Sequence, residues 1–395
     1  MTMTDDLGDR RARPAPYTAA ALAAAGREQA HGDGAVSGPP IPHAVNPAGI
    51  GVGDVLVLRA LGLGDALTGI APLRGLRRLF PDHRLILAAP GPVGAWLADL
   101  GVVDGVLPTP GLVDLPPMAG GHVAVDLHGR GPASQRLLAA ARPGSGEPSR
   151  LIAYSCPEVG HTGPVWRSDE HEVERWCRLV AEAGGPCGPA DLLLRYHRPA
   201  PADAPVVLHP GAAFGSRRWP ADRWRAVAAD LATAGHRVLV TGSTAERELT
   251  AVVSAGLAGV RDLGGALGLT GLSAVVDGAA LVLSGDTGIA HLATALAVRS
   301  VVLFGPTPPA RWGPAVDAHL HTVLWHGAAA ARTWGDPHGD TLDDRLAAVT
   351  VTEVTAAVDA QLRAPVTPPT TSPSSAINAG VGAITVPVPS TEGRP

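Results

Sequence analysis

The amino-acid sequence predicts an α/β protein whose folded part consists of two halves. In both halves, short apolar runs typical of buried strands alternate with longer segments of helical pattern. In the second half, Ala280–Leu283 predicts a strand, Ile289–Leu296 a helix and Val301–Phe304 another strand, which together form one parallel β-α-β unit. Because ligands of parallel sheets bind at the carboxyl ends of the strands, the loop 285–288 is the first candidate site.

Composition and charge limit the classes of protein that are possible. The 395 residues, 46% of them hydrophobic, suffice for two domains and tails. The net charge of −5 argues against a nucleic-acid-binding protein, and no nucleic-acid partner is expected. The sequence contains no lysine, so every fixed side-chain cation is an arginine. Cys156, Cys177 and Cys187 are odd in number and lack paired spacing, so neither a disulfide framework nor a zinc site is expected.

The sequence gives no sign of a membrane span or an export signal. No apolar run approaches the roughly 20 residues that a transmembrane helix needs. The amino terminus lacks the charged-then-apolar order of a signal peptide. We therefore expect a cytoplasmic protein. Residues 1–51 and 366–395 are polar and rich in small residues and proline, and we expect both segments to be disordered tails.

The first half is expected to span residues 52–167. Its first strand, Asp54–Arg59, leads into a turn rich in glycine. A helix is predicted from Asp65 to Phe80, with a kink at Pro72 because proline cannot donate a backbone hydrogen bond. Further strands are predicted at 85–87, 122–127 and 150–154, and a further helix at 93–100.

A bridging helix and a linker, residues 168–200, are expected between the two halves. The helix is predicted to begin at Ser168 and to end at Gly184, with an apolar stripe at i, i+3, i+4 and i+7. It also carries a cluster of charged residues that could ligate a metal or form a solvated polar face, and we favour the polar face. The cluster consists of Glu170, His171, Glu172 and Glu174.

The second half is expected to span residues 201–330 and to contain the β-α-β unit described above. A long polar loop, 209–220, follows its first strand, and Pro220 is the expected first residue of a helix that reaches Gly235. Strands are predicted at 206–208 and 236–240, and a helical segment is predicted at 331–365.

Small polar loops follow the carboxyl ends of several predicted strands, which indicates a cleft of the size of a nucleotide. The loop 285–288 precedes a helix whose free N–H groups and positive dipole end suit a phosphate. The alternative is that Asp286 and Thr287 only cap this helix.

Several motifs occur in order along the chain. They are Leu58-Arg59-Ala60-Leu61-Gly62-Leu63-Gly64-Asp65, His209-Pro210-Gly211, Arg217-Arg218-Trp219-Pro220, residues 242–246, Gly285-Asp286-Thr287-Gly288, His291-Leu292-Ala293 and Phe304-Gly305-Pro306-Thr307. In these motifs the chain resembles glycosyltransferase family 9, the heptosyltransferase-like group of GT-B enzymes, over roughly residues 52–360. The resemblance implies two Rossmann-like domains with parallel sheets facing an interdomain cleft. The C-terminal domain would bind a nucleotide-diphosphate sugar and the N-terminal domain an acceptor, with inversion and without a metal.

Asp65 is the predicted general base, because inverting transfer needs a group that takes a proton from the attacking acceptor hydroxyl. The alternative is an acid that only benefits from the helix dipole. Acceptor contacts are expected in the loops 122–131 and 156–167. The predicted acceptor-side residues are Gly62, Gly64, His128 and Arg130.

Arg217 aligns with a lysine of the family, and a cation there would neutralise the diphosphate leaving group. Arg218 could do the same, and the sequence does not distinguish the two. Glu246 resembles the acid that accepts hydrogen bonds from the donor's ribose, or it is an exposed first-turn acid; His291 faces the phosphates or packs its helix. The predicted donor-binding residues are Gly211, Arg217, Arg218, Glu246, Asp286, Thr287, Gly288, His291 and Gly305.

Two positions depart from the family pattern and concern donor affinity. Ala213 stands where the family often has Ser or Thr, and Arg217 stands where it usually has Lys. Arginine presents a planar fork where lysine presents a point charge, so the contact must differ in geometry. The sequence also lacks an Asp-x-Asp pair, the pattern by which metal-dependent sugar transferases commonly hold an ion. We therefore expect no metal site and no cofactor.

The predicted function is transfer of a heptose-like sugar from a nucleotide-diphosphate sugar, with ADP-heptose as the family's best-known donor. The acceptor would be a glycan, a glycolipid or a small molecule, and peripheral contact with the inner face of the membrane is left open. The alternatives are a GT-B-like nucleotide-sugar epimerase and a non-catalytic nucleotide-sugar-binding protein. A Rossmann dehydrogenase is disfavoured because Gly62-x-Gly64 lacks the third glycine of the dinucleotide-binding fingerprint.

Overall fold

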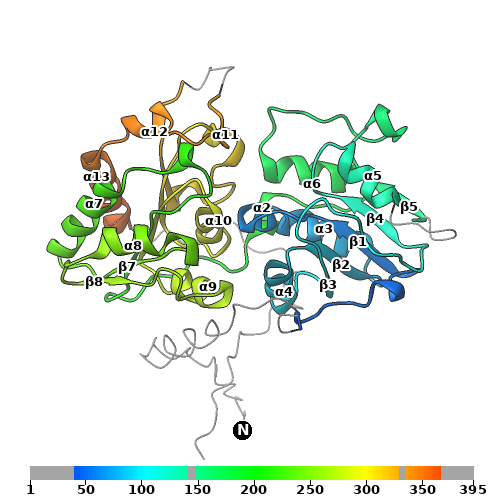
Figure 1. Ribbon diagram of the computed structural model, residues 1–395, viewed down its shortest axis with the longest axis horizontal. Helices are drawn as coiled ribbons and strands as arrows, with labels where there is room; N and C mark the ends of the chain where they lie inside the picture. Colours follow the sequence, from blue (N-terminus) through cyan, green and yellow to red (C-terminus); the bar gives the residue numbers. More distant parts are fainter. Residues whose placement is uncertain (1–39, 141–147, 329–333, 366–395) are drawn as a thin grey trace, which may run out of the picture.

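The computed structural model describes residues 40–140, 148–328 and 334–365, which form two lobes. The N-terminal lobe lies on the right in Figure 1 and the C-terminal lobe on the left. Each lobe contains one sheet, and every pair of neighbouring strands within these sheets is parallel. Two parallel sheets with helices confirm the predicted α/β class.

The N-terminal lobe has a five-stranded sheet in the order β3-β2-β1-β4-β5. All five residues of the central strand β1 are buried, as expected for a parallel strand covered on both faces. The strands are β1 (Asp54–Leu58), β2 (Arg84–Ala89), β3 (Gly105–Pro108), β4 (Val123–Asp126) and β5 (Arg150–Ile152). The helices are α2 (Leu63–Thr68), α3 (Ile70–Leu79), α4 (Gly91–Asp99), α5 (Ala133–Ala140) and α6 (Glu172–Glu182).

The C-terminal lobe has a six-stranded sheet in the order β11-β10-β9-β6-β7-β8. Its strands are β6 (Val206–His209), β7 (Val238–Val240), β8 (Val260–Asp262), β9 (Leu281–Gly285), β10 (Ser300–Leu303) and β11 (His321–Leu324). Its helices are α7 (Ala221–Thr233), α8 (Arg247–Ser254), α9 (Leu269–Asp277), α10 (Gly288–Ala295), α11 (Pro309–Trp312), α12 (Asp344–Ala348) and α13 (Val351–Arg363). No helix in the described ranges is long and apolar enough to span a bilayer.

The two lobes touch through α2 and α10, which lie side by side in the middle of Figure 1. A Cβ atom added to Gly288 would lie 3.0 Å from the Cβ of Leu63 and 3.2 Å from the backbone nitrogen of Gly64. A Cβ added to Gly64 would lie 3.0 Å from Cδ2 of His291. Glycine at these two positions therefore lets the first turns of the two helices approach closely.

The folded part begins earlier than residue 52, where we expected a disordered tail to end. Ala44 forms a parallel bridge with Val106, and Gly51 forms one with Gly120. Ile50 is completely buried against strands β1 and β2. The segment is polar overall, so its few buried apolar residues gave no clear signal in the sequence. Residues 1–39 and 366–395 lie outside the described residues.

The helix predicted from Asp65 to Phe80 is in fact two helices, which are separated at Gly69 and not kinked at Pro72. Pro72 lies in the first turn of α3, where its missing N–H leaves no hydrogen bond unmade. A Cβ on Gly69 would lie 2.9 Å from Cδ of Arg59, so the break occurs where the Arg59 side chain passes. Similarly, Pro220 is the N-cap of α7 and not its first helical residue.

The expected bridging helix belongs to the N-terminal lobe. It begins at Glu172 and not at Ser168, because His171 is its N-cap, and it packs on α3. The chain crosses to the other lobe only after the 3-10 helix at Pro189–Leu192. The prediction also lacked the short elements β3, α5, β8, α11 and β11.

We expect Ile50→Ala to lower the free energy of unfolding by about 2–4 kcal/mol, because the truncation leaves a cavity in the core of the N-terminal lobe. The matched control is Val52→Ala, two residues further on, whose side chain is 90% exposed. That variant should change stability by less than about 0.5 kcal/mol. Denaturant unfolding measures both, and equal small effects would contradict the inclusion of residues 40–51 in the core.

Candidate functional site

The carboxyl ends of the central strands of both sheets lead into the two helices that meet between the lobes. Strand β1 is followed by α2, which carries Asp65 in its first turn, and β9 is followed by α10, whose N-cap is Thr287. The Thr287 side chain makes no capping hydrogen bond. The first turn of α10 is thus left without a side-chain cap, which argues against the interpretation of Asp286 and Thr287 as a helix cap alone.

Asp65 is a partly buried carboxylate at the contact between the lobes. Burial raises the pKa of its carboxyl above the ordinary value. Arg59 lowers this pKa, Glu172 raises it, and Arg217 from the other lobe lowers it. Asp65 therefore faces charges from three different segments of the chain, which sequence spacing could not reveal.

Arg59 is the main cation on the N-terminal side and is 1% exposed. Its Nε donates to the backbone oxygen of Asp65, and its Nη1 donates to that of Leu127. Its Nη2 donates to Oγ1 of Thr68 at 2.8 Å and lies 3.4 Å from Oε1 of Glu172 and 3.8 Å from Oδ1 of Asp65. We gave Arg59 no role from the sequence, although an arginine directly after a buried apolar strand signals a partnered buried charge.

Arg217 and Arg218, which the sequence could not distinguish, have different surroundings. Arg217 is half-buried and its Nη1 donates to the backbone oxygen of Asp286 at 3.2 Å. Its Nε is buried and has no hydrogen-bond partner among the described residues. Arg218 is exposed, and it donates to the backbone oxygens of Ala212 at 2.8 Å and Ala213 at 3.3 Å. The geometry therefore favours Arg217 as the cation that faces the lobe contact.

Asp286 and His291 are both buried, and each is 7% exposed. Burial raises the pKa of Asp286 to about 6; Arg217 lowers it and Asp65 raises it. Burial, together with nearby His171, Arg59 and Arg217, lowers the pKa of His291 to about 4, so its ring is neutral at pH 7. The ring packs edge-on against Trp312 with centroids 5.7 Å apart, and it also faces Gly64. His291 therefore packs at the contact between the lobes, and its role towards the phosphates stays a prediction.

Glu246 and Gly211 lie together at the edge of the C-terminal site. Oε2 of Glu246 accepts hydrogen bonds from the backbone nitrogen and the hydroxyl of Ser243, at 2.7 and 2.8 Å. A Cβ on Gly211 would overlap the Glu246 carboxylate, so glycine is required for this approach. Gly305 is placed differently: a Cβ there would lie 3.1 Å from the Cβ of Leu346. It packs between α12 and the backbone oxygen of Ser216, which lies 3.4 Å from the same Cβ position.

The predicted acceptor-side residues lie on the N-terminal lobe. Burial and the charge of Arg59 lower the pKa of His128 to about 4, whereas Arg130 is exposed. Gly62 is the N-cap of α2, and its carbonyl accepts from the backbone nitrogen of Ala66 at 3.0 Å. His128 thus belongs to the surroundings of Arg59, Gly62 begins the helix that carries Asp65, and Arg130 is exposed to solvent.

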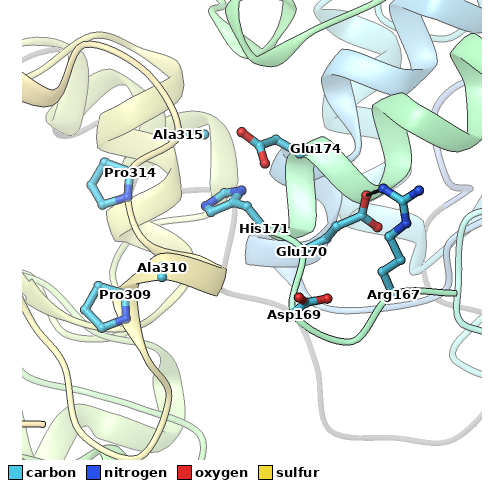
Figure 2. Close-up of a pocket in the computed structure, with 9 residues that line it drawn as sticks. All are labelled: Arg167, Asp169, Glu170, His171, Glu174, Pro309, Ala310, Pro314 and Ala315. Atoms are coloured by element: carbon cyan, nitrogen blue, oxygen red, sulfur yellow. Dashed lines mark ion pairs between the residues drawn. The ribbon is translucent and has the colours of Figure 1, made fainter. Parts of the chain in front are cut away.

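A cavity of about 520 Å³ lies between the lobes (Figure 2). One wall is the segment that leads into α6, and the other surrounds α11 in the C-terminal lobe. Nε2 of His171 lies 2.9 Å from the backbone oxygen of Gly313 across this gap, and because Nδ1 accepts from Val173, Nε2 is the donor. The cavity is lined by Arg167, Asp169, Glu170, His171, Glu174, Pro309, Ala310, Pro314 and Ala315.

The cavity and the charged cluster bear on two predictions. Of the loop 156–167, Arg167 alone lines this cavity, and most of its N-terminal wall comes from residues 169–174. The expected acceptor contacts of the loop stay a prediction. Glu172 does not lie on a solvated face, because it is 6% exposed. In the described part of the chain, no group of three or more His, Cys, Asp or Glu side chains is arranged to hold a metal ion.

Comparison with known proteins identifies a family whose model matches half of this chain. Residues 137–334 match the family described as Glycosyltransferase family 9 (heptosyltransferase). Lipopolysaccharide heptosyltransferase 1 of Pseudomonas aeruginosa is 38% identical over 160 residues, which are 38% of this chain and 44% of that protein. The matched region therefore spans less than half the length of this curated relative.

Two solved structures are similar over most of the described chain. The glycosyltransferase family 9 protein from Veillonella parvula superposes with a TM-score of 0.63 at 15% identity and covers 80% of this chain and 99% of that one. The E. coli heptosyltransferase WaaC with ADP has a TM-score of 0.57 at 18% identity and covers 78% and 99%. At these identities the likeness concerns the fold, and it confirms the predicted GT-B arrangement of two Rossmann-like domains.

We expect Asp286→Asn to stabilise the ligand-free protein at pH 7. Because the pKa of Asp286 is raised from 3.8 to about 6, the folded state binds a proton more tightly than the unfolded state. Stability is therefore lost as the pH rises from about 4 to about 6, and the loss is complete above it. Removing the charge should recover roughly 1–3 kcal/mol at pH 7 and almost nothing at pH 4.

Denaturant unfolding of the two proteins at pH 4 and pH 7 measures this difference. The control is Asp230→Asn, an exposed aspartate of α7, which should change stability by less than about 0.5 kcal/mol at both pH values. A destabilised Asp286→Asn protein at pH 7 would show that the carboxylate is a net stabilising group.

Proposed function

This chain belongs to glycosyltransferase family 9, and we propose that it transfers a heptose-like sugar from a nucleotide-diphosphate sugar to a hydroxyl group. The observation that carries the proposal is that a possible base from one lobe lies close to anion-stabilising groups from the other. A carboxylate that could accept a proton, Asp65, comes from one lobe. A cation and a helix start without a side-chain cap, Arg217 and α10, come from the other.

The C-terminal lobe would bind the donor. As the bond between the anomeric carbon and the phosphate oxygen breaks, negative charge grows on the diphosphate. Arg217 supplies a half-buried guanidinium whose Nε has no partner in the described residues. The first turn of α10, beginning at Gly288, supplies backbone N–H groups and a positive dipole end. Together these groups would stabilise the leaving group, so we propose a mechanism that needs no metal.

The N-terminal lobe would bind the acceptor and carry out the proton transfer. Asp65 would take the proton of the acceptor hydroxyl while its oxygen attacks the anomeric carbon from the face opposite the diphosphate. This forms the new glycosidic bond, breaks the old one and inverts the configuration. Burial raises the pKa of Asp65, which makes it a stronger base than an exposed aspartate.

A relative supports the choice of donor base, and the cavity supports the place of the acceptor. A similar E. coli heptosyltransferase was solved with ADP, so ADP-heptose is the first donor to test. Glu246 would accept hydrogen bonds from the ribose hydroxyls, since it lies at the edge of the site beside Gly211. The acceptor would be a glycan, glycolipid or small molecule that enters the cavity between α6 and α11. We propose action in the cytoplasm, with peripheral contact to a membrane if the acceptor is a glycolipid.

We expect Asp65→Asn to reduce the turnover of sugar transfer by about 10²–10⁴-fold, because asparagine cannot accept the proton. The Kd of ADP-heptose, measured by calorimetry, should change little. The control is Asp82→Asn, an exposed aspartate in the turn after α3, which should keep full turnover. A chelator should leave the wild-type rate unchanged.

Unchanged turnover in Asp65→Asn would remove Asp65 from the mechanism, and strong inhibition by the chelator would contradict the metal-free step. Formation of epimerised donor in a reaction without acceptor would identify a nucleotide-sugar epimerase. Binding of ADP-heptose without transfer, hydrolysis or epimerisation would identify a binding protein.

We expect Arg217→Ala to weaken ADP binding by about 10–100-fold, which corresponds to the loss of a charge-assisted hydrogen bond of roughly 1.5–3 kcal/mol. Arg218→Ala should weaken it less than about threefold, because its guanidinium is occupied by Ala212 and Ala213. Arg217→Lys should lose less affinity than Arg217→Ala because the positive charge remains, but it should not reach the wild-type affinity because the planar fork is lost. Calorimetry with ADP distinguishes the two arginines, and a larger loss in Arg218→Ala would reverse the assignment.

A further inference from the structure

We propose that Arg59 and Glu172 are positioning residues for the transfer reaction, which hold Asp65 in place and set its basicity. The inference rests on the proposed role of Asp65 as the base. Neither residue faces the acceptor, because both are almost fully buried, at 1% and 6% exposure. They would act through Asp65 alone.

Arg59 fixes the backbone that carries Asp65. Two of its nitrogens bond to α2, through the backbone oxygen of Asp65 and the hydroxyl of Thr68, and the third bonds to Leu127 at the end of β4. The guanidinium therefore ties α2, at Asp65 and at its last residue Thr68, to the ends of two strands of the sheet. Glycine at position 69 leaves space for the Arg59 side chain, because a Cβ atom there would lie 2.9 Å from Cδ of Arg59.

Glu172 is the counter-charge that reaches Arg59 from a distant segment. It is the first residue of α6, and its Oε1 lies 3.4 Å from Nη2 of Arg59 and accepts from Nε1 of Trp176 at 2.6 Å. Its Oε2 accepts from Nη1 of Arg175. The two arginines and Glu172 leave one positive charge, which an ionised Asp65 balances. Buried charges are tolerated only when they are paired in this way.

Arg59 and Glu172 have opposing effects on the pKa of Asp65. Oδ1 of Asp65 lies 3.8 Å from Nη2 of Arg59. Burial has the largest effect and raises the pKa of Asp65; Arg59 lowers this pKa, and Glu172 raises it. Loss of Glu172 would therefore lower the pKa and weaken the base, and a general base works best with a pKa close to the working pH. From the C-terminal lobe, Arg217 and Asp286 also interact with Asp65, and neutral His291 packs beside Gly64.

The test is the titration of Asp65 in Glu172→Gln, a change that removes the charge and keeps the shape. With ¹³Cγ-labelled aspartate, the Asp65 signal is assigned by its loss in Asp65→Asn. We expect its midpoint to move to lower pH by at least ~0.5 units. The acid limb of kcat/KM should move by the same amount, and the turnover on the plateau should fall. The control is Glu182→Gln at the other end of α6, whose carboxylate pairs with Arg178 and which should leave the midpoint in place.

A second variant keeps the test decisive if Glu172→Gln fails to fold. In Arg59→Met, the positive charge beside Asp65 is removed while Glu172 keeps its bond from Arg175, and the midpoint should rise because Arg59 lowers the pKa of Asp65. An unmoved Asp65 midpoint in either variant, or a kcat/KM that falls equally at every pH, would overturn the inference and leave Glu172 a structural role. The NMR titration needs no substrate, so failure of the proposed function, seen as unchanged transfer by Asp65→Asn, is distinguishable.

Discussion

The close contact between the first turns of α2 and α10 is the constraint on which the site depends. Gly64 and Gly288 approach so closely that a side chain at either position would meet the other lobe at about 3.0 Å. This approach brings Asp65 near Asp286 and Arg217, although the three residues come from different lobes or loops. The positive end of α10 points into the same region, where negative charge is favourable. A catalytic carboxylate and an anionic leaving group would therefore share one small volume.

The same contact has an energetic cost that the rest of the fold must offset. Burial raises the pKa of Asp286 and of Asp65, and it lowers that of His291. Each shift means that the ligand-free protein holds a group in surroundings that disfavour its charge. Core strands such as β1 and β9, buried along their whole length, provide the stability that tolerates this. Groups whose burial disfavours their charge are those expected to interact with substrate.

The sequence predicted the features that depend on local pattern and on parallel topology. Buried apolar runs identified β1 and β9, and the rule that ligands bind at carboxyl strand ends placed Arg217 and the loop 285–288 at one edge of the C-terminal sheet, where Nη1 of Arg217 bonds to Asp286. That Asp65 faces them from the other lobe followed only from the family resemblance. The pairing of Arg59 with Glu172 could not be predicted, because 113 positions separate them and neither stands in a recognisable spacing. The cavity between α6 and α11 was missed for the same reason, since its walls come from different lobes. Gly305 belonged to a motif, and its contacts with Leu346 of α12 and with Ser216 depend on tertiary packing that the motif does not reveal.

The two adjacent arginines illustrate how a departure from the family pattern can be accommodated. Ala213 offers no hydroxyl, but its backbone oxygen and that of Ala212 accept hydrogen bonds from Arg218. These bonds span the turn of the loop and fix its shape. With the loop held in this way, the neighbouring Arg217 is directed to the backbone oxygen of Asp286. Arg218 thus holds the loop through backbone oxygens and needs no hydroxyl at position 213. Arg217 keeps a planar fork, whose remaining donors would suit a phosphate.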